Sequence, residues 1–463
     1  MFEPRIYQDR RKRLKEQLGS GVALFLGNEE SPMNYTANTY PFRQDSSFLY
    51  YFGLDTPSLA GVVDIDEGKD RLFGNDVSME DIIWMGELPS LKERAENIGV
   101  KETLPLNKLS SFLKKAIQEG RKIHFLPPYR SETVLKIGEL LGIQPLLVKN
   151  YSSVKLIKAV VAQRSEKKSE EIEEMEKAHE VTYKMYQTAM SMATSGRYEK
   201  ELAGRMEGIC FETGCLLAFP IILTINGQIL HNHYHGNHLD EGRLLVMDAG
   251  AESPLHYAAD ITRTVPVGGK FTSRQRDVYQ IVLEAQETAI EAMKPGVYFK
   301  EVHLKSARVI TEGLKNLGLM KGNVDEAVQA GAHALFFPHG LGHMIGLDVH
   351  DMENFGENYV GYDETVDRSQ EFGLACLRFA KKLKPGYTLT VEPGIYFIPA
   401  LIDQWHSEKK HIQFIENDKV NSYRDFGGIR IEDDVLITQD GSRVLGKSIP
   451  KKVEDVEKIT ASR

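Results

Sequence analysis

The sequence predicts an α+β protein built from two domains, a smaller α/β domain followed by a larger catalytic one. Its 463 residues exceed the size at which a single hydrophobic core stops growing. Short β-like runs alternate with helical segments between residues 22 and 141, which is typical of an α/β domain. After residue 170, two pairs of helical segments are each followed by strand-like segments. This order indicates a duplicated α+β half-domain, although no sequence repeat is visible.

The first domain is expected to span residues 1–165. Apolar runs at 22–26, 60–64, 71–73 and 123–126 predict strands, and the segments 107–118 and 131–141 predict helices. The segment 40–52 is rich in aromatic side chains, and core packing is the expected role for most of them. This domain carries none of the candidate ligands described below, so its expected role is to cover, position or oligomerise.

The second domain is expected to span residues 166–450. Ser169, followed by Glu170 and Glu171, predicts a helix start, with the hydroxyl as cap and the acids on the positive end of the helix dipole. Apolar side chains at helical spacing predict helices over 171–192, 274–293 and 302–317. The last residues, 451–463, are polar and are expected to form a loosely held tail.

Composition excludes several classes of protein. A hydrophobic content of 41% with 27% charged residues is ordinary for a soluble globular chain. The net charge of −9 argues against a nucleic-acid partner, because affinity for phosphates comes from clustered Lys and Arg. The sequence has no apolar leader and no long apolar stretch, so a cytoplasmic protein without a membrane partner is expected. Three cysteines, Cys210, Cys215 and Cys376, have neither disulfide-framework nor zinc-site spacing, and we expect them to be small buried hydrophobes.

Two carboxylates flank a predicted hairpin. Asp248 ends an apolar run and precedes a glycine, and Asp260 begins the next apolar run. If the two runs pair, both carboxylates lie at neighbouring positions. Side by side they repel, and a bound cation is the natural reason for such an arrangement. The alternative is that both acids cap turns.

Three histidines follow within a glycine-rich segment, His339, His343 and His350. Metal ligation needs only one of them, and the others can donate hydrogen bonds to a substrate carbonyl or to a developing oxyanion. Singly, each histidine is also compatible with a structural role; their clustering favours a functional one.

Two further carboxylates stand at predicted strand ends. Glu392 precedes a Pro-Gly turn, and strand alternation places Glu432 on the same face as Arg430. The guanidinium of Arg430 would orient a neighbouring ligand. Asp433 and Asp434 are competitors of Glu432 that spacing alone does not exclude.

Together these positions supply four carboxylates and one imidazole. Oxygen-rich ligation with a single histidine suits a pair of divalent ions, Mn²⁺ first, with Co²⁺, Zn²⁺ or Fe²⁺ as alternatives. The histidine-rich stretch 230–238 precedes the first carboxylate strand, which favours an active-site loop over a metal-sequestering tract.

The segments DAG…DITRT, HGLGHMIGLDVHD, TVEPGIY and GIRIEDD resemble the motifs of one metallopeptidase family. That family contains Xaa-Pro aminopeptidase (aminopeptidase P), prolidase and, more distantly, methionine aminopeptidase. The N-terminal stretch YPFRQDSSFLYYFG resembles the corresponding part of bacterial aminopeptidase P. The resemblance implies a pita-bread catalytic domain, which is a duplicated half around a curved sheet, preceded by a smaller α/β domain.

The resemblance also implies roles for individual residues. Asp248 would bind one metal, Asp260 and Glu432 would bridge both, and His343 and Glu392 would bind the second. The substrate-contacting histidines of the family match His231, His339 and His350, and its motif arginine matches Arg430. His233 and His235 lie close to His231 in the sequence and compete with it for this role.

The implied reaction is removal of the N-terminal residue from peptides with proline second, by attack of a hydroxide that bridges the two metals. Glu392 would relay a proton toward the leaving nitrogen. The alternatives are a prolidase that cuts Xaa-Pro dipeptides, a creatinase-like hydrolase, and a metal-free binding module on the same fold. Insertions at 355–379 and 399–425 could change the length of peptide admitted.

The family resemblance implies a homodimer or homotetramer formed through the N-terminal domain. Trp84 is a candidate to reach a neighbouring active site, with core burial as the equal alternative.

Overall fold

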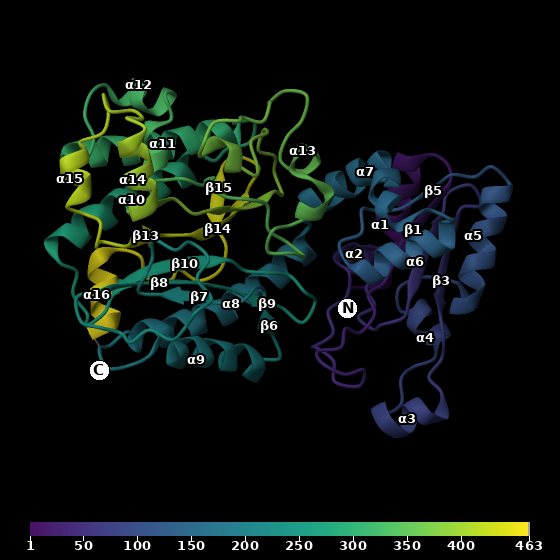
Figure 1. The fold of residues 1–463 in the computed structure, drawn as a ribbon. Helices are drawn as coiled ribbons and strands as arrows, with labels where there is room; N and C mark the ends of the chain where they lie inside the picture. Colours follow the sequence, from purple (N-terminus) through teal and green to yellow (C-terminus); the bar gives the residue numbers. More distant parts are fainter. Residues whose placement is uncertain (462–463) are drawn as a thin grey trace. The chain divides into compact units, whose positions relative to one another are not determined.

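The computed structural model describes residues 1–461, and the chain divides into two units (Figure 1). The first unit comprises Met1–Arg164 together with Met352–Tyr359. The second comprises Ser165–Asp351 and the chain from Val360 onward.

The first unit is built on a mixed five-stranded sheet. Its strand order is β4-β3-β2-β1-β5, in which β1 is antiparallel to β2 and parallel to β5. Every residue of β1 is buried, because both faces of this central strand are covered. Val22, Leu24 and Leu26 join one core, while Phe25 lies 4.7 Å from the ring of Tyr51. The strands are β1 (Val22–Leu26), β2 (Ala60–Asp64), β3 (Lys69–Gly74), β4 (Glu102–Pro105) and β5 (Ile123–His124).

Helices surround this sheet. The aromatic segment forms α2 (Ser46–Phe52), which Asp45 caps by accepting a 2.8 Å hydrogen bond from the backbone N–H of Phe48. Every residue of α2 is buried, which confirms the predicted core role, whereas Tyr40 is exposed. The other helices are α1 (Pro4–Leu18), α3 (Met79–Met85), α4 (Leu91–Glu96), η1 (Leu106–Lys108), α5 (Leu109–Gln118), α6 (Ser131–Leu141), η2 (Pro145–Tyr151) and α7 (Val154–Ser165).

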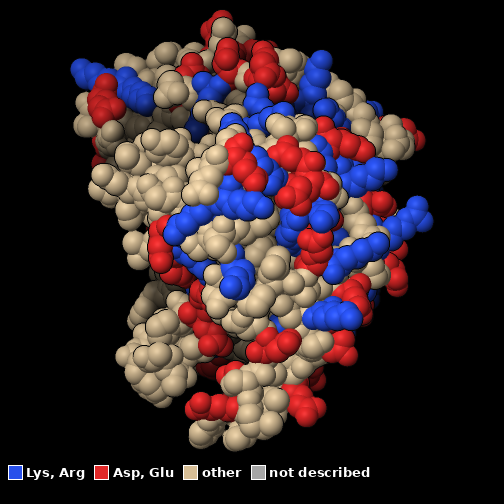
Figure 2. Space-filling view, turned by 90° about the vertical axis from the view of Figure 1, so that its right-hand side faces the viewer, with Lys and Arg blue, Asp and Glu red and all other residues tan. Residues whose placement is uncertain are grey.

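Charged side chains of both signs are mixed on the face of the molecule in Figure 2, where Lys and Arg lie among Asp and Glu. Pairs such as Lys136 with Glu29, at 2.6 Å, illustrate this mixing. No helix within residues 1–461 combines the length and the apolar character needed to cross a membrane.

The second unit contains two helix pairs with strands between them (Figure 1). Helix α8 (Ser169–Ser191) packs on α9 (Glu199–Glu212), and α10 (Ser273–Ala292) packs on α11 (Phe299–Asn316). Strands follow each pair in the sequence, so the predicted duplication is confirmed. The remaining helices of this unit are α12 (Val324–Gln329), η3 (Ala332–Leu335), η5 (Leu374–Cys376), α14 (Pro399–Ser407), α15 (Asn417–Asn421) and α16 (Val453–Ala461). The segment of the first unit that follows α11 in the sequence carries η4 (Glu353–Phe355) and the first three residues of α13 (Glu357–Val360).

The strands of the second unit form short antiparallel groups with the orders β10-β8-β7, β11-β14-β15, β12-β13 and β6-β9. The bridge between Thr262 and Glu432 joins the first group to the segment after β13. Segments from the two halves therefore meet beside the carboxylates. The strands are β6 (Leu216–Leu217), β7 (Ile222–Thr224), β8 (Leu244–Ala249), β9 (Ala251–Glu252), β10 (Ile261–Pro266), β11 (Thr388–Val391), β12 (Gly394–Tyr396), β13 (Gly428–Arg430), β14 (Asp433–Ile437) and β15 (Ser442–Val444).

Three local expectations were wrong. Ser169 is the first residue of α8 rather than its cap, and the side chain of Glu171 accepts a hydrogen bond from the backbone of Lys168. Most of the expected polar tail forms α16, because Val453 and Val456 bury their apolar side chains. Cys210 and Cys215 are buried as expected, but Cys376 is exposed.

Candidate active site

The predicted hairpin of Asp248 and Asp260 is present. Strand β8 pairs antiparallel with β10, and Asp248 lies opposite Thr262 in the register. Asp260 immediately precedes β10, and both side chains are buried. One carboxylate oxygen of each, Oδ1, has no hydrogen-bond partner among residues 1–461. Two buried carboxylates with unused oxygens are the expected state of cation ligands.

Glu432 joins this pair from the second half. Its backbone N–H donates to Thr262 O at 3.0 Å, and the hydroxyl of Thr262 donates to Glu432 Oε2 at 2.6 Å. Ligand atoms of Asp260, His343 and Glu432 all lie within 4.8 Å of one another. These three buried groups form a candidate metal centre.

Hydrogen bonds hold His343 in this centre. Its backbone N–H donates to Thr390 Oγ1 at 3.1 Å, and its ring Nδ1 lies 3.0 Å from Met344 O. The acceptor at Nδ1 places the ring proton there and leaves Nε2 free to bind a metal. Nε2 lies 3.5 Å from Asp260 Oδ2 and 3.9 Å from Glu392 Oε1.

Glu392 follows strand β11 at the same site. Its backbone N–H donates to Leu341 O at 2.8 Å, and its side chain is 20% exposed. Its Oε2 lies 3.9 Å from His339 Nδ1. Nε2 of His339 lies 3.0 Å from the hydroxyl of Tyr396.

Arg430 makes three side-chain hydrogen bonds, two of which reach the first half of the domain. Its guanidinium donates to Asp248 Oδ2 at 2.5 Å, to Tyr396 OH at 3.0 Å and to Thr262 Oγ1 at 3.1 Å. The pKa of Arg430 is raised: burial opposes this, but Tyr396 and the nearby carboxylates outweigh burial. This fixed cation holds Asp248, whereas strand alternation predicted Glu432 as its neighbour.

The competitors of Glu432 have other partners. Asp433 accepts hydrogen bonds from Arg263 Nη2 at 2.6 Å and Lys451 Nζ at 2.7 Å, and these cations hold the pKa of its carboxyl below the usual range, although burial opposes this. Asp434 Oδ2 lies 2.9 Å from His179 Nε2. These partners hold Asp433 and Asp434 away from the candidate centre. Of the three acids, Glu432 is therefore the one that belongs to it.

Burial raises the pKa of Asp260 and Glu432 well above their usual values, and the neighbouring carboxylates raise both further. Burial also raises the pKa of Glu392 to about 7. A cluster of carboxylates that cannot all ionise alone is stabilised by a cation. The unpartnered oxygens of Asp248 and Asp260 and the Nε2 atom of His343 therefore fit divalent metal ions.

His231 lies in the loop 225–243 and is exposed to solvent. Partial burial lowers its pKa, and the charge of Arg430 lowers it further. Its competitor His235 instead places Nε2 3.0 Å from Ile221 O. The main chain thus holds His235, whereas the charge of Arg430 acts on His231.

Arg378 is a site residue that the sequence analysis missed. Its Nη1 lies 3.0 Å from His350 Nε2, and its charge lowers the pKa of His339 and His343, in both of which burial is the larger cause. It follows η5 in the predicted insertion 355–379, and no spacing rule connects this position with the motif histidines. Tyr396 was also missed, although it ends the motif TVEPGIY.

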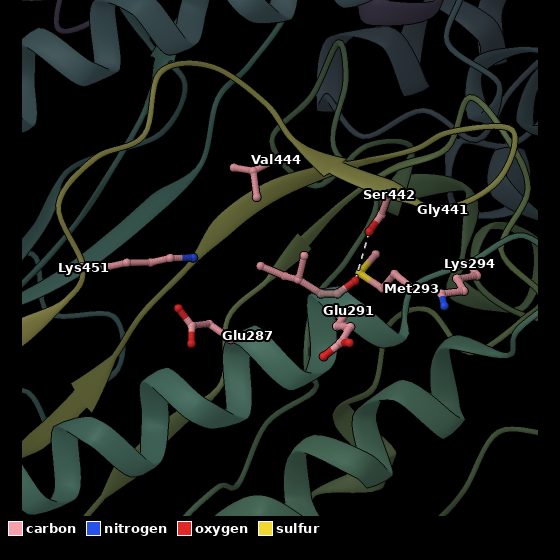
Figure 3. Close-up of a pocket in the computed structure, with 9 residues that line it drawn as sticks. Glu287, Glu291, Met293, Lys294, Gly441, Ser442, Val444 and Lys451 are labelled. Atoms are coloured by element: carbon pink, nitrogen blue, oxygen red, sulfur yellow. Dashed lines mark hydrogen bonds between the residues drawn. The ribbon is translucent and has the colours of Figure 1, made fainter.

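A separate pocket of about 410 Å³ lies between the end of α10 and β15 (Figure 3). Ser442 closes one side by donating a 3.0 Å hydrogen bond to Ile290 O. None of the candidate ligands lines this pocket, so it is distinct from the carboxylate centre.

Comparison with known proteins identifies the fold and the chemistry. The model of metallopeptidase family M24 matches residues 173–439, and that of the aminopeptidase P N-terminal domain matches residues 7–124. The chain belongs to metallopeptidase family M24. It is therefore a hydrolase of peptide bonds, as the sequence predicted.

Curated relatives of this M24 peptidase carry two names. Over 470 residues it is 33% identical to the Xaa-Pro dipeptidase of Homo sapiens, covering 99% of this chain and 92% of the relative. Over 448 residues it is 34% identical to a probable Xaa-Pro aminopeptidase of Sordaria macrospora, covering 95% and 91%.

Solved structures share the whole architecture. Aminopeptidase P of Escherichia coli, in complex with substrate, matches with a TM-score of 0.81 and 29% identity, covering 99% of this chain and 98% of that one. The Pseudomonas aeruginosa aminopeptidase PepP matches with a TM-score of 0.82 and 27% identity at the same coverages. The predicted pita-bread fold with a preceding α/β domain is confirmed.

Proposed function

We propose that this M24 peptidase is an Xaa-Pro aminopeptidase that uses two divalent metal ions, with Mn²⁺ as the physiological metal. The observation that carries the proposal is the buried cluster of Asp260, His343 and Glu432, which Asp248 and Glu392 extend on either side. Co²⁺, Zn²⁺ and Fe²⁺ share the same ligand preference. A zinc-substituted Escherichia coli aminopeptidase P in complex with product is among the similar structures.

In this proposal Asp248 and Asp260 hold one ion, His343 and Glu392 hold the other with Asp260, and Glu432 bridges them. The ions would make water nucleophilic at neutral pH and polarise the carbonyl that precedes proline. Arg430 holds Asp248 in one orientation by its 2.5 Å hydrogen bond.

The remaining site residues move protons and bind the peptide. Glu392 is 20% exposed, so its carboxyl can exchange a proton with the leaving prolyl nitrogen. Burial lowers the pKa of His339 to about 3, so its ring is neutral and can donate a single hydrogen bond. His231 and His350 are the further candidates to contact the substrate. Proline has no N–H to recognise, so its selection depends on the shape of an apolar pocket.

The two insertions contact each other beyond these residues. The ring of Phe372, from 355–379, lies 5.9 Å from that of Trp405 in α14, which belongs to 399–425. We propose that this contact fixes both loops and limits the length of peptide that is cleaved.

A dipeptidase is the second candidate, and Arg378 favours it. A dipeptide places a free carboxylate one residue beyond the scissile bond, and a guanidinium beside His350 is a suitable partner for that charge. A longer peptide has a neutral amide at this position. The Homo sapiens relative is itself named a dipeptidase.

The deciding experiment is chelation, dialysis and Mn²⁺ re-addition, with parallel assays of Xaa-Pro-Yaa, Xaa-Pro and the amide Xaa-Pro-NH₂. We expect metal-restored cleavage of the tripeptide, at a rate that Arg378→Gln leaves within about threefold. Cleavage of only the free dipeptide, with a KM raised tenfold or more in Arg378→Gln, would establish the dipeptidase instead. An enzyme that keeps full activity without metal would refute the proposed chemistry.

We also propose a homodimer or homotetramer formed through the first unit. Helix α3 has no buried residue, and its exposed apolar side chains include Ile83, Trp84 and Met85. Such a patch is typical of an interaction site. Light scattering of Ile83→Asp and Trp84→Ala tests the idea, and an unchanged mass with unchanged kinetics would remove it.

A further inference from the structure

Helix α8 turns a row of polar side chains toward the strands that carry the ligands. His179, Thr182 and Tyr186 are buried and are spaced three and four residues apart, so they share one face of the helix. Thr182 Oγ1 accepts a 2.9 Å hydrogen bond from the backbone N–H of Ala251. Tyr186 donates its hydroxyl to Met247 O, at 3.0 Å, on strand β8. This polar face therefore attaches α8 to the ligand hairpin.

His179 is the member of this face that leads to a candidate ligand. Its side chain is 3% exposed, its Nδ1 lies 2.7 Å from Met175 O, and its Nε2 lies 2.9 Å from Asp434 Oδ2. Burial opposes protonation of this ring, but the nearby carboxylate of Asp434 outweighs burial and raises the pKa of His179. The side chain of Asp434 is itself fully buried.

Asp434, in turn, contacts the candidate ligand Asp260. The same Oδ2 accepts a 2.8 Å hydrogen bond from the backbone N–H of Asp260, at the residue where β10 is about to begin. Asp434 thus holds the main chain of a candidate ligand, and His179 holds Asp434. The contacts from the helix to the candidate ligand therefore run through three buried residues, His179, Asp434 and Asp260.

We propose that His179 is a positioning residue for the metal centre, which acts through Asp434 to fix the backbone of Asp260. The inference rests on the proposed function, because it assigns His179 a role only if Asp260 binds a metal ion. Residues that hold a metal ligand in place without touching the metal contribute strongly to the affinity for the metal. His179 itself touches neither substrate nor metal.

Removal of the imidazole has a defined consequence. Asp434 would lose the side chain that holds its Oδ2, and its carboxylate could then adopt another rotamer in the space that the imidazole leaves. The backbone N–H of Asp260 would lose an acceptor that is fixed in position. The change therefore lowers metal affinity by misplacing Asp260.

The test is calorimetric titration of metal-free protein with Mn²⁺, together with the thermal midpoint of the metal-free state. For His179→Leu we expect the affinity of a Mn²⁺ site to fall by about 10–100-fold. His179→Gln should recover most of the affinity, because its amide N–H can donate to Asp434. The matched control is His303→Leu, which removes another fully buried histidine that contacts no candidate ligand, and which should leave Mn²⁺ affinity unchanged.

A double-mutant cycle keeps the test decisive if His179→Leu folds poorly. His179→Asn, which is too short to reach Asp434, Asp434→Asn and their combination should give losses of Mn²⁺ affinity that are not additive, because both changes break the same series of contacts. Additive losses, or a His179→Asn variant that binds Mn²⁺ like the wild type, would overturn the inference. A wild-type protein that binds no Mn²⁺ would instead overturn the proposed function.

Discussion

Two helices of the catalytic domain bury polar side chains, with opposite results. On α8, His179, Thr182 and Tyr186 all contact acceptors or donors of the neighbouring structure. On α11, His303 and Ser306 are equally buried, yet their side-chain polar atoms have no hydrogen-bond partner among residues 1–461. The two halves repeat one architecture, but within residues 1–461 the buried polar face of α8 holds the ligand strands, whereas the buried His303 and Ser306 of α11 make no such contact.

The unpartnered group extends beyond α11. His333, in η3, is also buried without a partner in the described chain, and its ring lies 6.3 Å from that of His303. The ring of Phe337 lies 5.2 Å from His303 and 4.9 Å from His339. This group therefore packs behind an active-site histidine, but it contributes shape rather than hydrogen bonds.

The largest effects should come from ligands, whichever half supplies them. We expect Asp260→Asn and Glu432→Gln each to lower kcat/KM more than about 100-fold, because loss of a mere partner of a ligand already costs 10–100-fold. Asp440→Asn, an exposed acid on the β14–β15 turn, is the control and should change little. If either Asp260→Asn or Glu432→Gln leaves kcat/KM unchanged, the two halves do not contribute equally to the reaction. Steady-state kinetics at saturating Mn²⁺ measures both variants.

The next largest effect is expected on stability, from loss of the contacts that join the two halves. Arg263 on β10 is 1% exposed and donates to Asp433 Oδ1 and Glu432 O, both at 2.6 Å. Arg263→Leu should lower the free energy of unfolding by about 3–5 kcal/mol, because Asp433 keeps only Lys451 as a cation and the carbonyl of Glu432 loses its donor. The half-exposed Arg276, paired with Glu457, should lose less than about 1 kcal/mol on change to Gln. Urea unfolding of both variants measures the difference, and equal losses would contradict the expectation.

The two buried histidine groups should respond to pH in opposite ways. Burial lowers the pKa of His303 to about 3 and that of His333 to about 4. Below pH 6.5 these histidines bind protons in the unfolded chain but stay neutral in the folded protein. The free energy of unfolding that they contribute therefore falls from pH 6.5 toward pH 4. Burial also opposes protonation of His179, but Asp434 outweighs it and raises the pKa. Its contribution is therefore complete below pH 6.5 and is lost as pH rises through the folded pKa.

Unfolding midpoints measured from pH 4.5 to pH 8 separate the two groups. His303→Leu should flatten the acid side of the profile, by up to about 3 kcal/mol at pH 4.5. His179→Gln should flatten the alkaline side instead. Identical profiles for the two variants would show that the partners of these histidines do not control their protonation.

The smallest effects compare single hydroxyls on the two helices. Tyr186→Phe removes a buried hydrogen bond to β8 and should cost about 1 kcal/mol. Ser306→Ala removes a hydroxyl that has no partner in the described chain, and should be neutral or slightly stabilising. Thermal midpoints of the two variants test this, and a larger loss for Ser306→Ala would reverse the comparison between α8 and α11.

Sequence alone determined the elements and the ligand types. Apolar spacing predicted β1, α8, α10 and the β8–β10 hairpin, because local periodicity reflects which side of an element is buried. It also predicted that carboxylates stand at strand ends. The polar face of α8 was not found, because the apolar residues of the same helix dominate the periodic signal.

Only the tertiary structure decided which groups meet. Glu432, Asp433 and Asp434 are neighbours in sequence and chemically equivalent, so spacing could not choose among them. In the fold, Arg263 and Lys451 hold Asp433, His179 pairs with Asp434, and Thr262 directs Glu432 into the cluster. Arg378 reached the site from a loop for the same reason: long-range contacts are fixed by packing between elements, and local spacing does not encode them.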